Sequence, residues 1–334
     1  MEKNIRDIAK EAGVSIATVS KVINDYPHVS AKTRDKVKRV IRDSRFIPNS
    51  AARELVRKRS MTIGLLLTTS LIHPFFHRLL IGMESALKKS GYDLIYLAQV
   101  SWNKDYSVVQ HCRSRNVEGV LLFGFQRHDL NLDELVSSEI PTIFIDLDLL
   151  GRRAGYITSD NAASLRNAIQ YLYGLNHRRI AFLSGSPDSY VGKTRFDAYT
   201  NSLSEFGLPF KSEFVAFGDF SKESGYLGMK KLLQQKQQPT AVLCSSDLEA
   251  IGAIEAAQEE GLNVPEDLSV IGFDDIDIAA HYTPALTTIR QDIQRLGREA
   301  LELLVELVQN PDQSPPSVVI PTELIIRESC AEAK

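Results

Sequence analysis

The sequence has few of the features that mark secreted, membrane or disulfide-stabilised proteins. Its three cysteines, Cys112, Cys244 and Cys330, lie far apart and form neither a CxxC pair nor a Cys/His ligand spacing. Such isolated cysteines are typical of reduced thiols in a cytosolic protein. No apolar run approaches the roughly 20 residues that span a bilayer, and the first residues are charged rather than apolar as in a secretory signal. We therefore expect a cytoplasmic protein that does not enter a membrane.

Motifs for catalysis and metal binding are equally scarce. The seven histidines form no HExxH pattern, and no GxSxG nucleophile elbow occurs. Residues 185–194, GSPDSYVGKT, end like a phosphate-binding P-loop, but six residues rather than four separate Gly185 from Gly192. Pro187 lies within this stretch and has no amide hydrogen to offer a phosphate. The sequence thus predicts neither an enzyme nor a resident metal or cofactor.

Charge is distributed unevenly along the chain. The first 60 residues hold 15 Lys and Arg against 7 Asp and Glu, whereas the whole chain has a formal net charge of −3, so the remainder is acidic. A basic segment on an acidic body is typical of a protein that meets nucleic-acid phosphates at one end. A solvated helix face would explain one basic run, but not a charge imbalance that coincides with a helix-turn-helix pattern.

That pattern lies in residues 5–23, IRDIAKEAGVSIATVSKVI. Apolar residues recur at helical spacing on both sides of Gly13, which suits the left-handed position that ends a helix. Asn4 and Ser15 each stand where an N-cap belongs, and Ser30 caps a third predicted helix. Periodicity alone also fits a small helical packing unit without DNA-binding function. The basic charge favours the DNA-binding interpretation.

Residues 50–59, SAARELVRKR, favour a helix but are too few for an isolated helix to be stable in water. We predict that this segment becomes helical only when something docks against it. A plain linker is the alternative, and the residues themselves leave both open.

From residue 62 onwards, short apolar runs alternate with amphipathic segments. The predicted strands are 62–69, 92–98, 118–124, 141–146, 179–185, 240–245 and 268–275, and the predicted helices are 76–90, 161–173, 195–206, 222–236, 247–260 and 292–309. Near-continuous apolar strands between helices are typical of parallel sheets covered on both faces. About ten strands over this length predict two doubly wound lobes. The predicted fold class is therefore α/β, with an all-α helix-turn-helix head before the two parallel-sheet lobes.

Polar residues follow several of the predicted strands directly. They are Asp146, Asp160, Ser246-Asp247 and Asp274-Asp275, with Arg195 predicted to open the helix after strand 179–185. In such sheets a ligand binds beyond the carboxyl ends of the strands, which here predicts a cleft between the lobes. Carboxylates and a guanidinium suit a ligand rich in hydroxyl groups. Each of these residues can alternatively serve as a helix cap.

Several longer motifs occur in a fixed order along the whole chain. They are IRDIAKEAGVSIATVSKVIND, VSAKTRDKV, FIPNSAARELV, HPFFHRLLIGME, PTAVLCSSDLEAIGA, VPEDLSVIGFDDID and TPALTTIRQDIQRLG. Through them the chain resembles the lactose-repressor/galactose-repressor family of bacterial transcription factors. The resemblance implies a helix-turn-helix domain at 1–47, a hinge helix and linker at 48–61, and a ligand-binding and dimerisation domain at 62–334. The two lobes of that last domain are similar to periplasmic binding proteins.

The resemblance also implies roles in binding double-stranded DNA. Base edges in the major groove would be reached by Ile16, Ala17 and Lys21. Phosphate contacts, or caps beside them, fall on Thr18, Ser20, Asn24, Ser30 and Thr33. The hinge helix, with Asn49, Ala52 and Leu55, would enter the minor groove and insert its leucine into the central base step. A two-fold homodimer, joined through segments near 76–90 and 105–116, would read a near-palindromic operator.

In the predicted cleft, the family's ligand-binding positions fall on Ser70, Phe75, Asp146, Thr158, Asp160, Arg195, Phe220, Ser246 and Asp274. Ser246 stands where sugar-specific members often carry Asn or Thr. The resemblance predicts a repressor released from its operator by a sugar or sugar phosphate. Two alternatives stay open: a corepressor-dependent protein of the purine-repressor type, and a solute-binding receptor. The basic head and the missing signal sequence disfavour the receptor.

Overall fold

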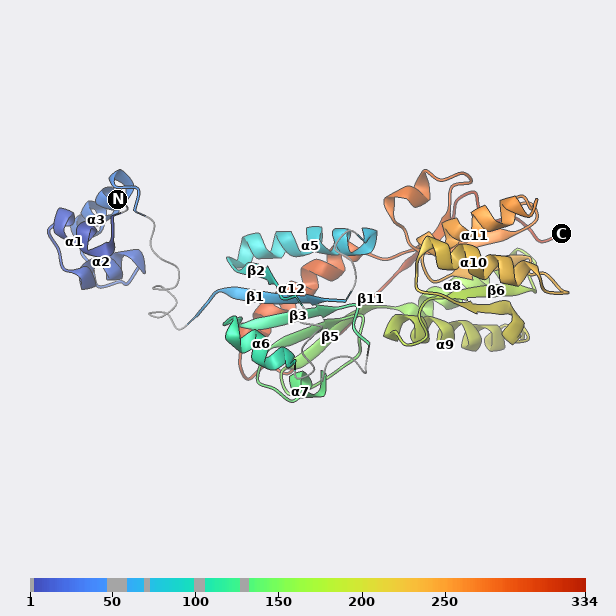
Figure 1. Cartoon of the computed structure of the whole chain (residues 1–334), viewed down its shortest axis with the longest axis horizontal. Coiled ribbons are helices and arrows are strands. Elements are labelled where there is room, and N and C mark those ends of the chain that lie inside the picture. The colour runs from blue at the N-terminus through green and yellow to red at the C-terminus, as the bar shows by residue number, and fades with distance from the viewer. Residues whose placement is uncertain (1–2, 47–58, 69–72, 99–105, 127–131) are drawn as a thin grey trace. The chain divides into compact units, whose positions relative to one another are not determined.

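The computed structural model describes residues 3–46, 59–68, 73–98, 106–126 and 132–334 (Figure 1). The chain divides into two compact units, Met1–Ser60 and Met61–Lys334. Most of the predicted hinge and linker segment, 48–61, lies outside the described residues. Its boundaries therefore stay a prediction.

Within residues 3–46, the amino-terminal unit contains three helices, α1 (Ile5–Ala12), α2 (Ile16–Ile23) and α3 (Ala31–Asp43). Their boundaries follow from capping. Asn4 forms a capping box at the start of α1, and Gly13 ends that helix with a φ of 59°. Ser15 and Ser30 cap α2 and α3. The small core between the helices consists of Ile8, Ala9, Ala12, Val19, Val22 and Val37.

The first lobe of the second unit is a six-stranded sheet in the order β11-β5-β4-β3-β1-β2, with every neighbouring pair parallel. The strands are β1 (Thr62–Leu67), β2 (Asp93–Tyr96), β3 (Gly119–Phe123), β4 (Thr142–Ile145), β5 (Ala154–Ser159) and β11 (Ser317–Ile320). One face packs against α5 (Pro74–Ser90) and α12 (Ile293–Gln309). The other face packs against α6 (Val108–Ser114) and α7 (Leu132–Val136).

The second lobe is also six-stranded, in the order β12-β10-β9-β8-β6-β7, and only β12 is antiparallel to its neighbour. Its strands are β6 (Ile180–Ser184), β7 (Val215–Phe217), β8 (Ala241–Cys244), β9 (Ser269–Asp274), β10 (Thr287–Arg290) and β12 (Glu323–Ile325). Helices α8 (Asn161–Gly174) and α9 (Tyr190–Glu205) cover one face. Helices α10 (Lys222–Leu233) and α11 (Asp247–Glu259) cover the other. The predicted α/β class with two doubly wound lobes is thus confirmed.

The chain passes between the lobes three times, after β5, after β10 and after β11 (Figure 1). Helix α12 therefore belongs to the first lobe although it follows most of the second lobe in the sequence. It packs on α5 through two glycines. A Cβ added to Gly82 would lie 1.9 Å from the backbone oxygen of Gln294, and one added to Gly297 would lie 2.1 Å from that of Leu79. The two helix backbones are in direct contact at these positions.

One predicted boundary is wrong. Helix α9 begins at Tyr190 rather than at Arg195, because Ser189 caps it by accepting the N–H of Gly192 at 3.0 Å. Arg195 consequently lies in the second turn of this helix. Gly192 lies in the first turn, so the stretch that ends like a P-loop is helical there and does not form a phosphate-binding loop.

Two cysteines lie in the cores of the lobes. Cys112 and Cys244 are buried free thiols, and burial raises the pKa of Cys112 to about 12. Among the described residues, no helix is both long and apolar enough to cross a membrane.

Candidate DNA-binding and ligand-binding sites

The outer side of helix α2 carries both polar and apolar side chains. Val19 and Val22 are buried against the other helices, which leaves Ile16, Ala17 and Lys21 exposed together. The side chain of Ile16 is 45% exposed. A helix with one face fixed in a core and a short exposed face of this kind can enter a DNA major groove.

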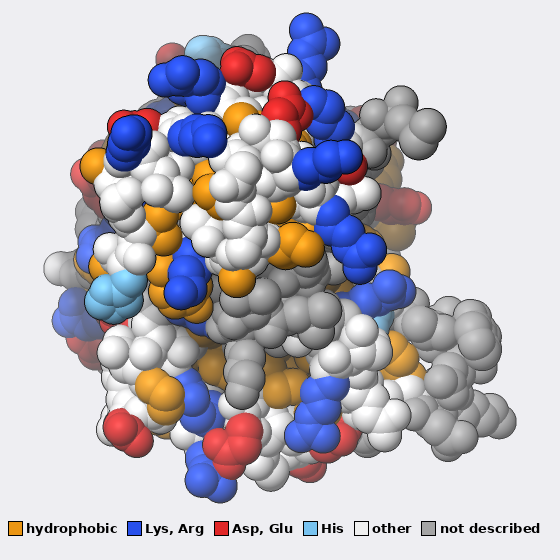
Figure 2. Space-filling model, turned by 90° about the vertical axis from the view of Figure 1, so that its left-hand side faces the viewer, with side chains coloured by type: hydrophobic (Ala, Val, Ile, Leu, Met, Phe, Trp, Pro, Cys, Tyr) orange, Lys and Arg blue, Asp and Glu red, His pale blue; other side chains and the backbone are white. Residues whose placement is uncertain are grey.

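The residues predicted near phosphates lie at helix ends. Ser30 Oγ accepts the N–H of Thr33 at 3.2 Å, and Asn24 Nδ2 donates to the backbone oxygen of Ser20 at 2.9 Å. Thr18 is hydrogen-bonded to the capping Ser15, at 2.9 Å between the hydroxyl oxygens. These contacts establish the capping roles and leave the phosphate contacts as predictions. Lys and Arg side chains are prominent on the surface seen in Figure 2, and α3 exposes Lys32, Lys36, Lys38, Arg39 and Arg42.

In the second lobe, buried acidic side chains gather at the carboxyl ends of β8 and β9. Asp247 accepts the backbone N–H of Ile276 at 2.8 Å and the hydroxyl of Thr288 at 2.5 Å. Asp274 accepts a hydrogen bond from Nε2 of Gln291 at 2.6 Å. Glu249, in the first turn of α11, accepts the N–H of Phe220 at 3.2 Å.

Arg195 is the buried cation beside these carboxylates. Its Nε donates to Oδ1 of Asn161 at 2.8 Å, and its Nη1 donates to the backbone oxygen of Ser245 at 2.5 Å. The guanidinium carbon lies 3.6 Å from the centroid of the Phe273 ring, within cation–π range. The side chain is therefore oriented by three different elements of the lobe.

Burial is the largest cause of the raised pKa values of the acidic groups. It raises the pKa of Asp274 to about 7 against the opposing effect of Arg195. Burial likewise raises the pKa of Glu249 to about 8. The pKa of Asp247 is raised well above its usual range, first by burial and then by the charge of Asp274. Carboxyl groups of this kind can be protonated near neutral pH and can then act as hydrogen-bond donors.

The first lobe adds a further acid to this group. Asp146 follows β4 with a φ of 56° and accepts a hydrogen bond from the Thr158 hydroxyl at 2.7 Å. Its pKa is raised by burial and lowered by that hydrogen bond and by the charge of Arg195. Asp146 in turn raises the pKa of Asp274. Charged groups of the two lobes therefore act on one another, as expected for a site between them.

Phe220 and Ser246 form a connected pair. Ser246 caps α11 by accepting the N–H of Glu249 at 3.0 Å and donates its own hydroxyl to the backbone oxygen of Phe220 at 2.9 Å. Phe220 has a φ of 68°. Its ring lies on Gly185, where an added Cβ would come within 2.0 Å of a ring carbon. A glycine is thus required beneath this ring.

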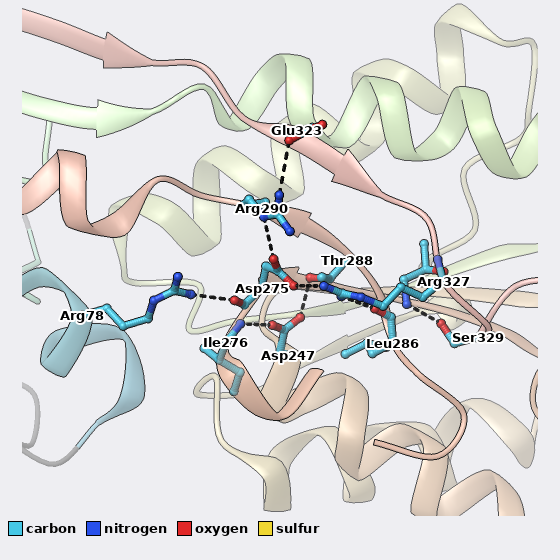
Figure 3. A network of polar contacts seen from close by, with 11 residues as sticks. Arg78, Asp247, Asp275, Ile276, Leu286, Thr288, Arg290, Glu323, Arg327 and Ser329 are labelled. Atoms are coloured by element: carbon cyan, nitrogen blue, oxygen red, sulfur yellow. Dashed lines mark hydrogen bonds and ion pairs between the residues drawn. The ribbon is translucent and has the colours of Figure 1, made fainter. Parts of the chain in front are cut away.

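A network of ion pairs in the second lobe is joined to the first lobe by one hydrogen bond (Figure 3). The carboxylate of Asp275 accepts hydrogen bonds from Arg290 at 2.7 Å and from Arg327 at 2.6 Å. Arg78 of α5, in the first lobe, donates from Nη1 to the backbone oxygen of Asp275 at 2.6 Å. Asp275 adjoins Asp274, so the contact between the lobes lies one residue from the acidic site.

Comparisons with known proteins agree with this arrangement. The description "Bacterial regulatory proteins, lacI family" matches residues 4–49, and "Periplasmic binding protein-like domain" matches residues 169–330. The ribose operon repressor of Haemophilus influenzae is 34% identical over 332 residues, which is 99% of each chain.

The chain belongs to the lacI family of bacterial regulatory proteins. The HTH-type transcriptional repressor PurR of Erwinia tasmaniensis is 36% identical over 334 residues, 98% of this chain and 97% of the relative. A crystal structure of the lac repressor dimer bound to operator and an anti-inducer has a TM-score of 0.86 at 29% identity, and covers 99% of this chain and 100% of that one. This lacI-family protein is a DNA-binding repressor that responds to a ligand.

The repressor brings together most of its predicted ligand-binding residues. Asp146, Arg195, Glu249 and Asp274 act on one another electrostatically, although Glu249 was not predicted. Asp160 caps α8 by accepting the N–H of Ala163 at 2.9 Å. Phe75 is buried and stacks on Phe123 with ring centroids 5.3 Å apart. Ser70, Asn49, Ala52 and Leu55 lie outside the described residues.

Sequence reasoning missed Arg78, Asn161 and Gln291. Gln291 directly follows β10, the same position that singled out Asp146 and Asp274, so its signal was present. Arg78 and Asn161 lie inside helices, where a polar residue is unremarkable. Their roles in this lacI-family repressor arise only from the packing of elements distant in the sequence.

Proposed function

We propose that this repressor acts in the cytoplasm as a homodimer that is released from a near-palindromic operator by a small sugar-like effector, and that it has no catalytic activity. The observation that carries the proposal is the polar group formed by Asp146 of one lobe and Arg195 and Asp274 of the other. A ligand bound there touches both lobes and favours one arrangement of them over another.

Residue chemistry supports a hydroxyl-rich effector. Phe220 offers an aromatic ring beside carboxylates and a guanidinium, and each of these charged groups can form two directed hydrogen bonds with hydroxyl groups. The name of the relative from Haemophilus influenzae refers to ribose, which is consistent with this chemistry. We assign Ser70, Phe75, Thr158, Asp160 and Ser246 to the same site on the strength of the family resemblance.

The proposed coupling runs from the lobes to the head. We propose that α5 and α6 form the dimer contact, which is supported by Leu80 and Ile81 of α5 being 37% and 41% exposed. A change in the arrangement of the lobes would shift the two first lobes against each other. The predicted hinge helices at 48–61 would then lose their joint docking on DNA. A coupling free energy of about 3 kcal/mol would change operator affinity by roughly 10²-fold.

One alternative has a specific observation behind it. The relative PurR from Erwinia tasmaniensis is as similar as the ribose operon repressor, so an effector that strengthens operator binding stays a second candidate. Titration of operator affinity against effector distinguishes the two by sign. Release on titration supports induction, and tighter binding supports corepression.

The first experiment is selection of fragmented genomic DNA on the purified full-length protein, with sequencing of the retained fragments. Enrichment of one near-palindrome supports the proposal, and the neighbouring genes indicate which compounds to titrate. Leu55→Ala should then bind that operator much more weakly while retaining its effector affinity. Arg195→Ala should bind the operator normally without responding to effector. If neither variant differs from the wild type, the proposed coupling is wrong.

A further inference from the structure

The first residue of the second unit has an unusual backbone conformation. Met61 directly precedes β1 and has a φ of 54°, in the left-handed region that residues with a side chain rarely adopt. At this residue the chain passes from the predicted linker into the first lobe. A backbone conformation of this kind persists only where the surrounding contacts impose it.

Three contacts hold Met61 in place. Its backbone N–H donates a hydrogen bond of 2.9 Å to Oε1 of Glu118, and its backbone oxygen accepts the N–H of Asp93 at 2.9 Å. Its side chain packs against the hydrophobic core that β1 shares with α5 and α12. The chain therefore enters the first lobe at a fixed point.

Glu118 is itself oriented by its neighbours. The hydroxyl of Tyr92, a residue that is 4% exposed, donates to Oε2 of Glu118 at 2.9 Å. The backbone N–H of Glu118 donates to the oxygen of Thr62 at 2.9 Å. The adjacent Gly119 lies against α12, because a Cβ added to it would come within 2.9 Å of the Leu304 side chain. The carboxylate is thus held in one orientation.

The sheet does not need this carboxylate for its own pairing. The ladder between β1 and β3 starts at Ile63, and the ladder between β1 and β2 starts at Thr62. Backbone hydrogen bonds of these ladders align the strands without a side chain. The contact between Glu118 and Met61 extends the ordered chain by one residue towards the predicted linker. Its effect is therefore on the residue to which the linker is attached.

We propose that Glu118 is a positioning residue for operator binding, which fixes the direction in which the linker leaves the first lobe. The segment 50–59, predicted to become helical on DNA, ends shortly before Met61. In a homodimer the second head binds its half-site intramolecularly, at an effective concentration that depends on how freely the linkers move. A fixed exit reduces the freedom that is lost on binding, and so strengthens binding to the whole operator. The inference rests on the proposed homodimer and near-palindromic operator.

The test compares the binding of the full-length protein to two DNA duplexes of equal length. One duplex carries the selected operator, and the other carries one of its half-sites beside scrambled sequence. Glu118→Ala should bind the operator about tenfold more weakly than the wild type does, and the half-site with an affinity within about twofold of the wild type. Fluorescence anisotropy measures both affinities. An unchanged operator affinity would overturn the inference, and so would an equal loss on both duplexes, because damage to folding lowers the two affinities alike.

Two further variants separate the hydrogen bond from the mere presence of a side chain. The amide oxygen of Glu118→Gln can still accept the Met61 N–H, so this variant should bind the operator within about threefold of the wild type. A loss as large as that of Glu118→Ala would contradict the role given to the hydrogen bond. Glu139→Ala removes an exposed carboxylate of the same lobe, which pairs with Arg152 at the surface, and should leave both affinities unchanged.

Tyr92→Phe tests the same contact in a protein that loses only one hydroxyl group. Glu118 is then less firmly oriented, and operator affinity should fall by about threefold while half-site affinity stays the same. If Tyr92→Phe binds the operator as tightly as the wild type does, the inference is wrong, even where Glu118→Ala does not fold. A wild type that binds the operator no more tightly than the half-site would instead contradict the proposed homodimer, and with it the inference.

Discussion

Arg78 donates a hydrogen bond of 2.6 Å to the backbone oxygen of Asp275 and so joins helix α5 of the first lobe to the end of β9 in the second. The accepting carbonyl is held in place because Arg290 and Arg327 both pair with the Asp275 carboxylate. Asp275 has a φ of 53°, and its neighbour Asp274 has a φ of 112°. The loop that carries Asp274, a residue of the proposed ligand site, is therefore fixed from its own lobe by two arginines and from the other lobe by one.

Arg78→Ala should loosen the loop at 274–276. The guanidinium of Arg78 is a charged donor, and hydrogen bonds from charged donors contribute about 1.5–3 kcal/mol to stability. Amide hydrogen exchange at Ile276, whose N–H is bonded to Asp247, should accelerate by about tenfold or more in the variant. Arg113→Ala, at an exposed position of α6, is the control. Equal exchange rates in both variants would show that the contact does not hold the lobes together.

Gly82→Ala and Gly297→Ala should each destabilise the second unit. An added methyl group meets backbone of the facing helix at about 2 Å, so α5 and α12 must separate. Overpacking of this kind typically costs about 1–3 kcal/mol. Gly174→Ala is the matched control, because nothing lies within 4 Å of its added Cβ. The free energy of unfolding in urea measures the effect, and three equal values would contradict the close packing of these helices.

Stability should fall as the pH rises from about 5 to about 9. The folded-state pKa of Asp274 is raised to about 7 and that of Glu249 to about 8, both above their values in an unfolded chain. The folded state therefore retains protons that the unfolded state releases, and this stabilisation is lost as the pH rises through the folded pKa values. A tenfold difference in proton affinity between the two states corresponds to about 1.4 kcal/mol of stability.

The variant Glu249→Gln tests how much Glu249 contributes to this fall in stability with pH. The free energy of unfolding of the variant should fall less between pH 5 and pH 9 than that of the wild type, by up to about 4 kcal/mol. Glu266→Gln, at an exposed position of the same lobe, is the control, and its pH profile should follow the wild type. Parallel profiles for all three proteins would indicate that Glu249 does not retain its proton in the folded state.

Lys21→Gln should weaken operator binding without altering stability. Lys21 is exposed on the outer side of α2, away from the buried Val19 and Val22. Loss of one cationic contact to a base costs about 1–3 kcal/mol, or roughly 5- to 150-fold in affinity. Lys89→Gln, exposed on α5, is the control. Operator affinity, measured by fluorescence anisotropy, should be unchanged in the control. If Lys21→Gln binds the operator as tightly as the wild type, Lys21 does not contact DNA.

Sequence reasoning succeeded where the signal was local. Caps at Asn4, Ser15 and Ser30 located three helices, because a capping side chain acts within one turn. The seven predicted strands all form, since a strand buried on both faces is apolar throughout. Five observed strands, β5, β7, β10, β11 and β12, have no counterpart among the seven predicted runs. The short strands β7 and β12 are only partly buried and carry no such run.

The proposed ligand site shows the limits of the same reasoning. Polar residues at strand ends could be predicted, because parallel strands place their carboxyl ends at one edge of a sheet. The orientation of Arg195 by Asn161 and Phe273 could not be predicted, because these three residues lie on different elements. The position of Arg195 within α9 was also predicted wrongly, since Ser189 rather than Arg195 marks the start of the helix.

The placement of α12 has a consequence for how the protein is made. Ile293, Leu296, Leu301 and Leu304 of this helix, together with Ile320 of β11, complete the core beneath β1 and α5. These residues leave the ribosome only after nearly all of the second lobe has been synthesised. The apolar face of the first lobe therefore stays uncovered until these residues have been synthesised. A nascent chain arrested before residue 293 would expose that face to chaperones and proteases.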